Sequence, residues 1–87
     1  MKATMPKKRK AAPSKETMAR LIGQRVRAAR AAAGMGQIEA SERAGIVQGY
    51  LSDIERGKSC SVVTLAKIAA ALGVDLVDLL PNQGGKP

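Results

Sequence analysis

The apolar residues of this 87-residue chain recur at helical spacing in several segments, and glycines separate these segments. In the first segment apolar side chains recur at intervals of four, three and four residues, which places them on one face of a helix. They are Ile22, Val26, Ala29 and Ala33. Ser14 is suited to cap the start of this helix and Gly34 to end it. We therefore expect an amphipathic helix that begins near Lys15.

Three further helices are expected from the same kind of pattern. A short helix runs from about Gln37 to Arg43 and stops at Gly45, and the next one ends at Gly57. A fourth helix begins after Ser61, and its apolar surface is broad enough to suggest a central position in the core. That surface is a stripe of Leu65, Ile68 and Leu72, widened by Val62, Ala66 and Ala69.

A last short helix is expected between Asp75, which is suited to cap it, and Pro81, which stops it. It carries Leu76, Leu79 and Leu80. The pattern as a whole predicts an all-α domain of five helices over residues 14–81. The remaining residues, 82–87, are expected to form a disordered tail.

The third helix, in the segment "GIVQGYLSDIERGKS", has an unusual beginning. Val47 stands where a capping serine or threonine is expected, and Gly49 lies in the first turn. At about 100° per residue one side of the helix carries apolar side chains and the other carries polar ones. The apolar side consists of Val47, Leu51 and Ile54, and the other side of Gln48, Gly49, Ser52, Asp53 and Arg56. An amide, a hydroxyl, a carboxylate and a guanidinium are groups that read base edges in a major groove, although an ordinary solvated helix face has the same polarity.

Charge is concentrated at one end of the chain. The net charge is +8, and residues 1–15 contain six of the fifteen basic residues and no acidic one. Lysine, proline and alanine bury too little apolar surface to offset the entropy of ordering, so residues 1–13 are expected to be a flexible basic arm. The arm is interpreted as binding a polyanion through Lys7, Lys8, Arg9 and Lys10. A solubilising role and a targeting role for its "PKKRK" run are the alternatives.

Composition argues against several kinds of function. The chain has no histidine and one cysteine, Cys60, so it cannot build a zinc site or a Cys/His catalytic site from its own residues. We expect no metal, no cofactor and no enzymatic activity, and so small a domain is expected to lack an effector pocket. No apolar run is long enough to span a membrane. A cytoplasmic protein, nucleoid-associated when bound to DNA, is therefore expected.

Five stretches of the chain carry a resemblance to a known family: "IGQRVRAAR", "GMGQ", "ERAG", "GYLSDIERGK" and "TLAKIAAALGVDLVDLL". Over about residues 19–80 the chain resembles the helix-turn-helix domain of lambdoid phage repressors and Cro proteins, the lambda repressor-like or Xre-type family. The chain departs from the family pattern at Gly36 and Val47, where a small polar cap is usual, and at Ile38, where a charge is common.

The resemblance implies a role in DNA binding for particular residues. Gln48, Gly49 and Asp53 match base-reading positions, and Ser52 lies on the same face. Backbone contacts are implied for Gln37, Tyr50, Arg56, Lys58 and Ser59. Each has a plainer alternative, such as packing of the Tyr50 ring or complementing of the helix C-terminus by Arg56 and Lys58. The resemblance also implies that Arg30 and Glu55 pair across the first and third helices.

The function expected from these features is that of a sequence-specific transcriptional repressor that binds a pseudo-palindromic operator on double-stranded DNA as a homodimer. Dimerisation is expected to use the fourth and fifth helices, with Leu76, Val77, Leu79 and Leu80 as candidates, unless all four close the core of the monomer. The alternative is an antitoxin-type protein-interaction module that also binds DNA to regulate its own gene.

Overall fold

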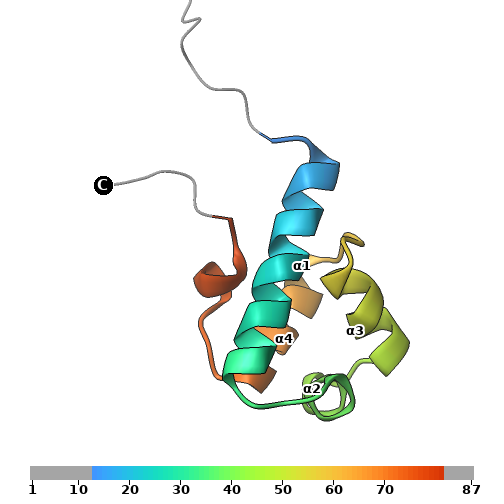
Figure 1. Ribbon diagram of the computed structural model, residues 1–87, viewed down its shortest axis with the longest axis vertical. Coiled ribbons are helices and arrows are strands. Elements are labelled where there is room, and N and C mark those ends of the chain that lie inside the picture. Colours follow the sequence, from blue (N-terminus) through green and yellow to red (C-terminus); the bar gives the residue numbers. More distant parts are fainter. Residues whose placement is uncertain (1–12, 82–87) are drawn as a thin grey trace, which may run out of the picture.

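The chain folds into four α-helices followed by one short 3₁₀ helix (Figure 1). The computed structural model describes residues 13–81, and the basic residues Lys7, Lys8, Arg9 and Lys10 therefore lie outside the described part. The helices are α1 (Lys15–Ala32), α2 (Gln37–Ala44), α3 (Gln48–Glu55), α4 (Val62–Leu72) and η1 (Leu76–Leu79). The expected all-α fold is confirmed over these residues, which contain no strand.

The predicted caps account for most of the helix boundaries. The Ser14 hydroxyl accepts a hydrogen bond from the Thr17 N–H at 3.1 Å, and the Ser61 hydroxyl accepts one from the Thr64 N–H at 3.0 Å. Gly45 and Gly73, each with a φ of 73°, close α2 and α4 in the left-handed conformation. That conformation is strained for residues with a Cβ atom, which explains why glycine stands at these two ends.

The fifth predicted helix is present, but it is a short 3₁₀ helix and not an α-helix. Leu76–Leu79 forms a 3₁₀ helix, in which the Asp78 N–H bonds the Asp75 carbonyl at 2.9 Å, three residues back. The Asp78 carboxylate in turn accepts a hydrogen bond from the Asp75 N–H at 3.0 Å. Only five residues separate Asp75 from Pro81, and one turn of this length closes more readily with bonds to the third residue than to the fourth.

The core is aliphatic and lies between all four α-helices and η1, with α2 contributing Ala40 and Ala44. Its largest fully buried side chains are Val26, Leu51, Ile54, Ile68 and Leu79. Figure 1 shows α1 crossing in front of α4, with α2 at the lower end of α1 and α3 beside it. The helix α3 is thereby held with one side against the core and the other directed away from it.

Some positions of the predicted apolar stripes are exposed, so the stripes are narrower than expected. Three of these positions are at helix ends: Ala33, which follows α1, Val47, which precedes α3, and Val62, which begins α4. Val47 is 72% exposed and Val62 67% exposed. Ala66, at the margin of the α4 stripe, is exposed as well. Periodicity gives the direction of a side chain and not the presence of a neighbour, which a helix end often lacks.

Gly23 allows α1 and α3 to approach each other closely. It is buried in the middle of α1, and a Cβ atom placed there would clash with the Ile54 carbonyl oxygen and come within 2.9 Å of the Glu55 carbonyl oxygen. Only a residue without a side chain fits against the α3 backbone at this point. Gly23 therefore helps to fix the position of α3.

Candidate nucleic-acid interface

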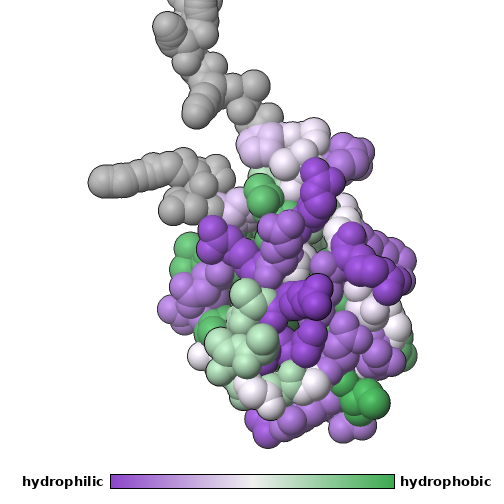
Figure 2. All heavy atoms as spheres, in the orientation of Figure 1, coloured by the Kyte–Doolittle hydropathy of each residue, from purple (hydrophilic) through white to green (hydrophobic). Residues whose placement is uncertain are grey.

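The polar side of α3 faces outward as a continuous surface. Leu51 and Ile54 are buried on the opposite side at 1% and 0% exposure. The residues expected to read bases are exposed or partly exposed on the outward side: Gln48, Gly49, Ser52 and Asp53. Figure 2 shows that hydrophilic residues dominate the surface on the side of α3. The fold thus presents these groups together on one helix face.

Arg30 and Glu55 form an ion pair between α1 and α3. The Arg30 Nε donates to one Glu55 carboxylate oxygen at 2.6 Å and its Nη2 donates to the other at 2.9 Å. The Arg30 Nη1 donates to the Met35 carbonyl at 3.0 Å, in the turn before α2. The side chains are only 16% and 4% exposed, respectively. A bidentate, largely buried pair of this kind fixes both helices and the intervening turn.

The same carboxylate begins a chain of hydrogen bonds that reaches the outward face. Gln37, the first residue of α2, donates from its Nε2 to Glu55 Oε1 at 3.0 Å. Its own Oε1 accepts a hydrogen bond from the Gln48 Nε2 at 2.8 Å. Because Gln37 must donate to a carboxylate, its amide oxygen is left to face Gln48. The amide orientation of Gln48 is therefore set by charges on α1 and α3.

This environment shifts the acidity of both members of the pair. Burial alone raises the pKa of Glu55, but the hydrogen bonds from Arg30 and Gln37, with the charges of Arg30 and Arg27, bring the pKa below its ordinary value. The hydrogen bond to Glu55 raises the pKa of Arg30 despite partial burial. Both groups are charged at neutral pH, which the hydrogen-bond chain requires.

Asp53 is neutralised within α3 itself. The Arg56 Nη2 lies 2.7 Å from Asp53 Oδ1, and Arg56 Nη1 also donates to the Ser52 hydroxyl at 3.2 Å. The two charged side chains are 43% and 71% exposed, so this is a surface pair of small energetic value. Its consequence is electrostatic, since a lone carboxylate on this face would repel a polyanion.

The far end of α3 carries a second basic group. The Lys58 Nζ lies 5.6 Å from the centroid of the Tyr50 ring, within the range of a cation–π contact. Lys58 and the neighbouring Ser59 are exposed, and Tyr50 is partly exposed. The residues implicated in backbone contacts thus lie along α3 and the loop after it, except Gln37, which is held between Glu55 and Gln48.

The beginning of α3 is open. Val47 supplies no side-chain hydrogen bond to the helix start, and within residues 13–81 a Cβ atom placed on Gly49 would meet nothing within 4 Å beyond its chain neighbours and its own stretch of helix backbone. Gly49 is therefore not required by internal packing, in contrast to Gly23. The importance of Gly23 escaped the sequence analysis, although a glycine inside a helix is itself a signal, because it costs about 1 kcal/mol relative to alanine.

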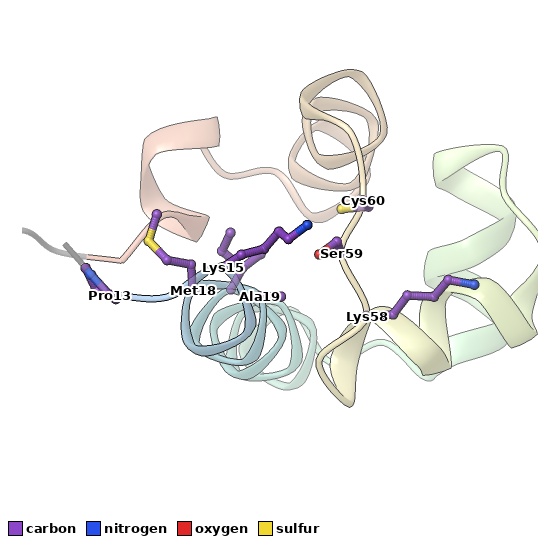
Figure 3. Close-up of a pocket in the computed structure, with 8 residues that line it drawn as sticks. Pro13, Lys15, Met18, Ala19, Lys58, Ser59 and Cys60 are labelled. Carbon is purple, nitrogen blue, oxygen red and sulfur yellow. The ribbon is translucent and has the colours of Figure 1, made fainter.

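A groove of about 280 Å³ lies between the start of α1 and the loop before α4 (Figure 3). Its walls include Met18, Ala19 and Cys60, and Lys15 extends across it, whereas Lys58 is directed away toward α3. The sequence analysis did not anticipate this groove, and the expectation that the domain lacks an effector pocket stays a prediction. Burial raises the pKa of the Cys60 thiol, which keeps it in its less reactive protonated form.

The residues considered for dimerisation are divided between core and surface. Leu79 is fully buried and Leu76 packs against the core, so these two close the monomer. Val77 and Leu80 are 67% and 37% exposed.

Within residues 13–81, no helix has the length and apolar character needed to cross a membrane, and no group of three or more cysteine or acidic side chains is placed to hold a metal ion.

Comparison with known proteins identifies the family. A helix-turn-helix family model matches residues 26–79. The HTH-type transcriptional regulator y4dJ of Sinorhizobium fredii is 41% identical over 71 residues, covering 80% of this chain and 92% of that protein. The immunity repressor of Bacillus phage phi105 is 38% identical over 63 residues, which are 71% of this chain and 44% of the repressor.

A solved structure agrees with this assignment. The Bacillus subtilis biofilm regulator SinR in complex with DNA has a TM-score of 0.63 and 38% identity, and the match covers 67% of this chain and 95% of that one. The family model covers more than half of the chain, and the order of α2, a tight turn and α3 is that of the motif. The chain therefore belongs to the lambda repressor-like, Xre-type helix-turn-helix family of DNA-binding transcriptional regulators.

Proposed function

We propose that this protein is a sequence-specific transcriptional repressor that inserts α3 into the major groove and binds a pseudo-palindromic operator as a homodimer. The observation that carries the proposal is the position of Gln48, whose amide stands at the outward beginning of α3 and is oriented by Gln37. SinR has been solved with DNA, and the phi105 relative is named a repressor, which supports the same activity here.

The oriented amide of Gln48 matches the edge of an adenine. One hydrogen of its Nε2 is used by Gln37, at 2.8 Å, which leaves the second hydrogen and the Oε1 lone pairs for DNA. Adenine offers N7 as an acceptor and N6 as a donor in the major groove, so a glutamine amide pairs with it in two hydrogen bonds. An amide that is already oriented loses less freedom on binding, which favours this base further.

The other residues of the interface take roles according to their chemistry. Gly49, Ser52 and Asp53 lie beside Gln48 for base contacts. Contacts to the DNA backbone are assigned to Gln37, Tyr50, Arg56, Lys58 and Ser59, and the basic arm, including Lys7, Lys8, Arg9 and Lys10, adds phosphate contacts without sequence preference. The ion pair with Arg56 reduces the repulsion between the Asp53 carboxylate and the DNA phosphates. In the complex the Arg56 guanidinium then interacts with both the Asp53 carboxylate and a phosphate.

Two copies of α3 are needed for useful specificity. One helix of eight residues reads only a few base pairs, and two half-sites about one helical turn apart extend that number. A cytoplasmic, nucleoid-associated location is part of this proposal. The antitoxin-type alternative stays a prediction, since nothing in residues 13–81 favours it over operator binding.

The proposal is tested by replacing Gln48 with alanine. Operator sites are first selected from a random DNA library with the parent protein. Gln48→Ala should then weaken binding to the preferred site by roughly 1 to 3 kcal/mol and relax the base preference at one symmetric position in each half-site. Binding to non-specific DNA should change little. Circular dichroism establishes that the variant is folded.

Gln24→Ala is the matched control, because Gln24 is an exposed glutamine of α1. It should leave both affinity and preference as in the parent. If folded Gln48→Ala selects the same sites with the same affinity as the parent, α3 does not read the operator and the proposal fails.

A further inference from the structure

Val47 serves neither of the purposes that normally explain a residue at the start of a helix. Its side chain makes no capping hydrogen bond, and it is 72% exposed rather than packed in the core. Valine is among the least favourable residues at an N-cap, where serine, threonine, aspartate and asparagine satisfy a free N–H group. An aliphatic side chain held in water at this position has no explanation within the monomer.

The position of Val47 is fixed and lies next to the base-reading amide. Its carbonyl accepts hydrogen bonds from the Tyr50 N–H at 3.1 Å and the Leu51 N–H at 3.2 Å, so its backbone belongs to the first turn of α3. Gln48 follows it directly and is bound to Gln37 at the start of α2. Figure 2 shows a strongly hydrophobic spot where α2 and α3 meet, and the exposed large aliphatic residues at these two helix starts are Ile38 and Val47.

The major groove contains one prominent apolar group, the 5-methyl group of thymine. We infer that Val47 packs against the methyl group of a thymine that neighbours the base pair read by Gln48, and that this contact selects thymine over cytosine there. The inference rests on the proposed operator binding and adds a second specificity-determining side chain to it. Val47 precedes Gln48 directly in an extended conformation, and the spacing of successive Cα atoms, about 3.8 Å, is close to that of successive base pairs.

The contact is apolar, so it is tested by removing the methyl group alone. In the selected operator each thymine is replaced in turn by deoxyuridine, which has the same hydrogen-bonding groups and lacks the methyl. Replacement of the thymine next to the Gln48-dependent position should weaken binding about fourfold per half-site, the value of one buried methyl-sized group. Replacement of the other thymines should have smaller effects.

Val47→Ser then assigns the effect to this side chain. Serine is able to cap α3, so the variant should be at least as stable to urea as the parent, and misfolding is not a concern. It should bind the thymine and deoxyuridine operators equally. Val63→Ser is the matched control, since Val63 is a valine of α4 that is 65% exposed, and it should keep the parent's methyl sensitivity.

The outcomes separate this inference from the proposed function. The inference is overturned if the preferred operator has no thymine at the neighbouring position, if deoxyuridine there binds as well as thymine, or if Val47→Ser keeps the full methyl effect. A protein partner as the true occupant of Val47 would give the second of these results. All three can occur while Gln48→Ala still relaxes adenine preference, so the reading role of α3 is judged independently.

Discussion

Two glycines inside helices, Gly23 and Gly49, lie in opposite environments. A Cβ atom at Gly23 would meet the α3 backbone at the Ile54 and Glu55 carbonyls, whereas one at Gly49 would meet no other element of the described fold within 4 Å. Gly23 is needed for the monomer to fold with α1 and α3 in contact. Gly49 is not needed for folding, and in the proposed function its benefit is close approach of the α3 backbone to DNA.

The same substitution at both positions tests this difference. Gly49→Ala should leave the free energy of unfolding unchanged or raise it by about 0.5 to 1 kcal/mol, because alanine favours the helix, while it weakens operator binding by crowding the DNA. Gly23→Ala should lower the free energy of unfolding by about 1 to 3 kcal/mol or more through overpacking. Urea titrations and binding assays on both variants provide the measurement. Unchanged operator affinity in Gly49→Ala would show that this glycine is simply tolerated.

The contrast also shows what the sequence could predict at this scale. The caps Ser14 and Ser61 each bond a backbone N–H three residues away, so their roles were predictable from local spacing. The role of Gly23 depends on which helix crosses α1 and where. The hydrogen bonds of Gln37 to Glu55 and Gln48 span 18 and 11 residues, and the resemblance, which implied a DNA backbone contact for Gln37, predicted neither of them.

At the scale of elements, three helices are joined around one carboxylate. The Glu55 carboxylate of α3 accepts hydrogen bonds from Arg30 of α1 and Gln37 of α2, and the Glu55 side chain is 4% exposed. The position of α3 relative to α2 is the geometry that a helix-turn-helix must keep. The Arg30–Glu55 pairing was anticipated through the family resemblance, whereas the 3₁₀ form of the last helix reflects a segment too short for an α-helix.

The lowered pKa of Glu55 predicts how the free energy of unfolding depends on pH. The pKa of Glu55 is lower in the folded protein than in the unfolded chain, so the folded state favours the ionised form. The resulting stability is fully present above the unfolded-state pKa of about 4.3 and is lost as the pH falls through the lower folded-state value. Urea titrations from pH 7 down to pH 2 should show this loss in the parent.

Glu55→Gln should remove this part of the pH dependence and lower the free energy of unfolding at pH 7 by roughly 3 to 5 kcal/mol, because Arg30 is left without its charged partner. Glu42→Gln, which changes an exposed carboxylate of α2, should leave the stability at pH 7 within about 0.5 kcal/mol of the parent. Equal stability of parent and Glu55→Gln at pH 7 would mean that the ion pair contributes nothing.

At the scale of the whole molecule, the open question is how two copies would place two α3 helices on one operator. Leu79 and Leu76 belong to the core, so an interface at this end of the fold is limited to exposed residues such as Val77 and Leu80 and to what surrounds them. A stable dimer interface buries about 800 Å² from each partner, so these two residues would form only its apolar centre.

Val77→Glu tests this placement, because it puts a charge on a side chain that is 67% exposed in the monomer and so spares the core. The variant should keep the parent's circular dichroism and stability, sediment as a monomer at micromolar concentration, and bind the full operator about a hundredfold or more weakly by losing the linked second half-site. Its affinity for an isolated half-site should stay the same. Ile38→Glu, which charges a similarly exposed aliphatic residue of α2, is the control for assembly and should remain dimeric. A parent protein that is monomeric both free and on the operator would rule out the dimer, and a dimeric Val77→Glu would move the interface elsewhere on the molecule.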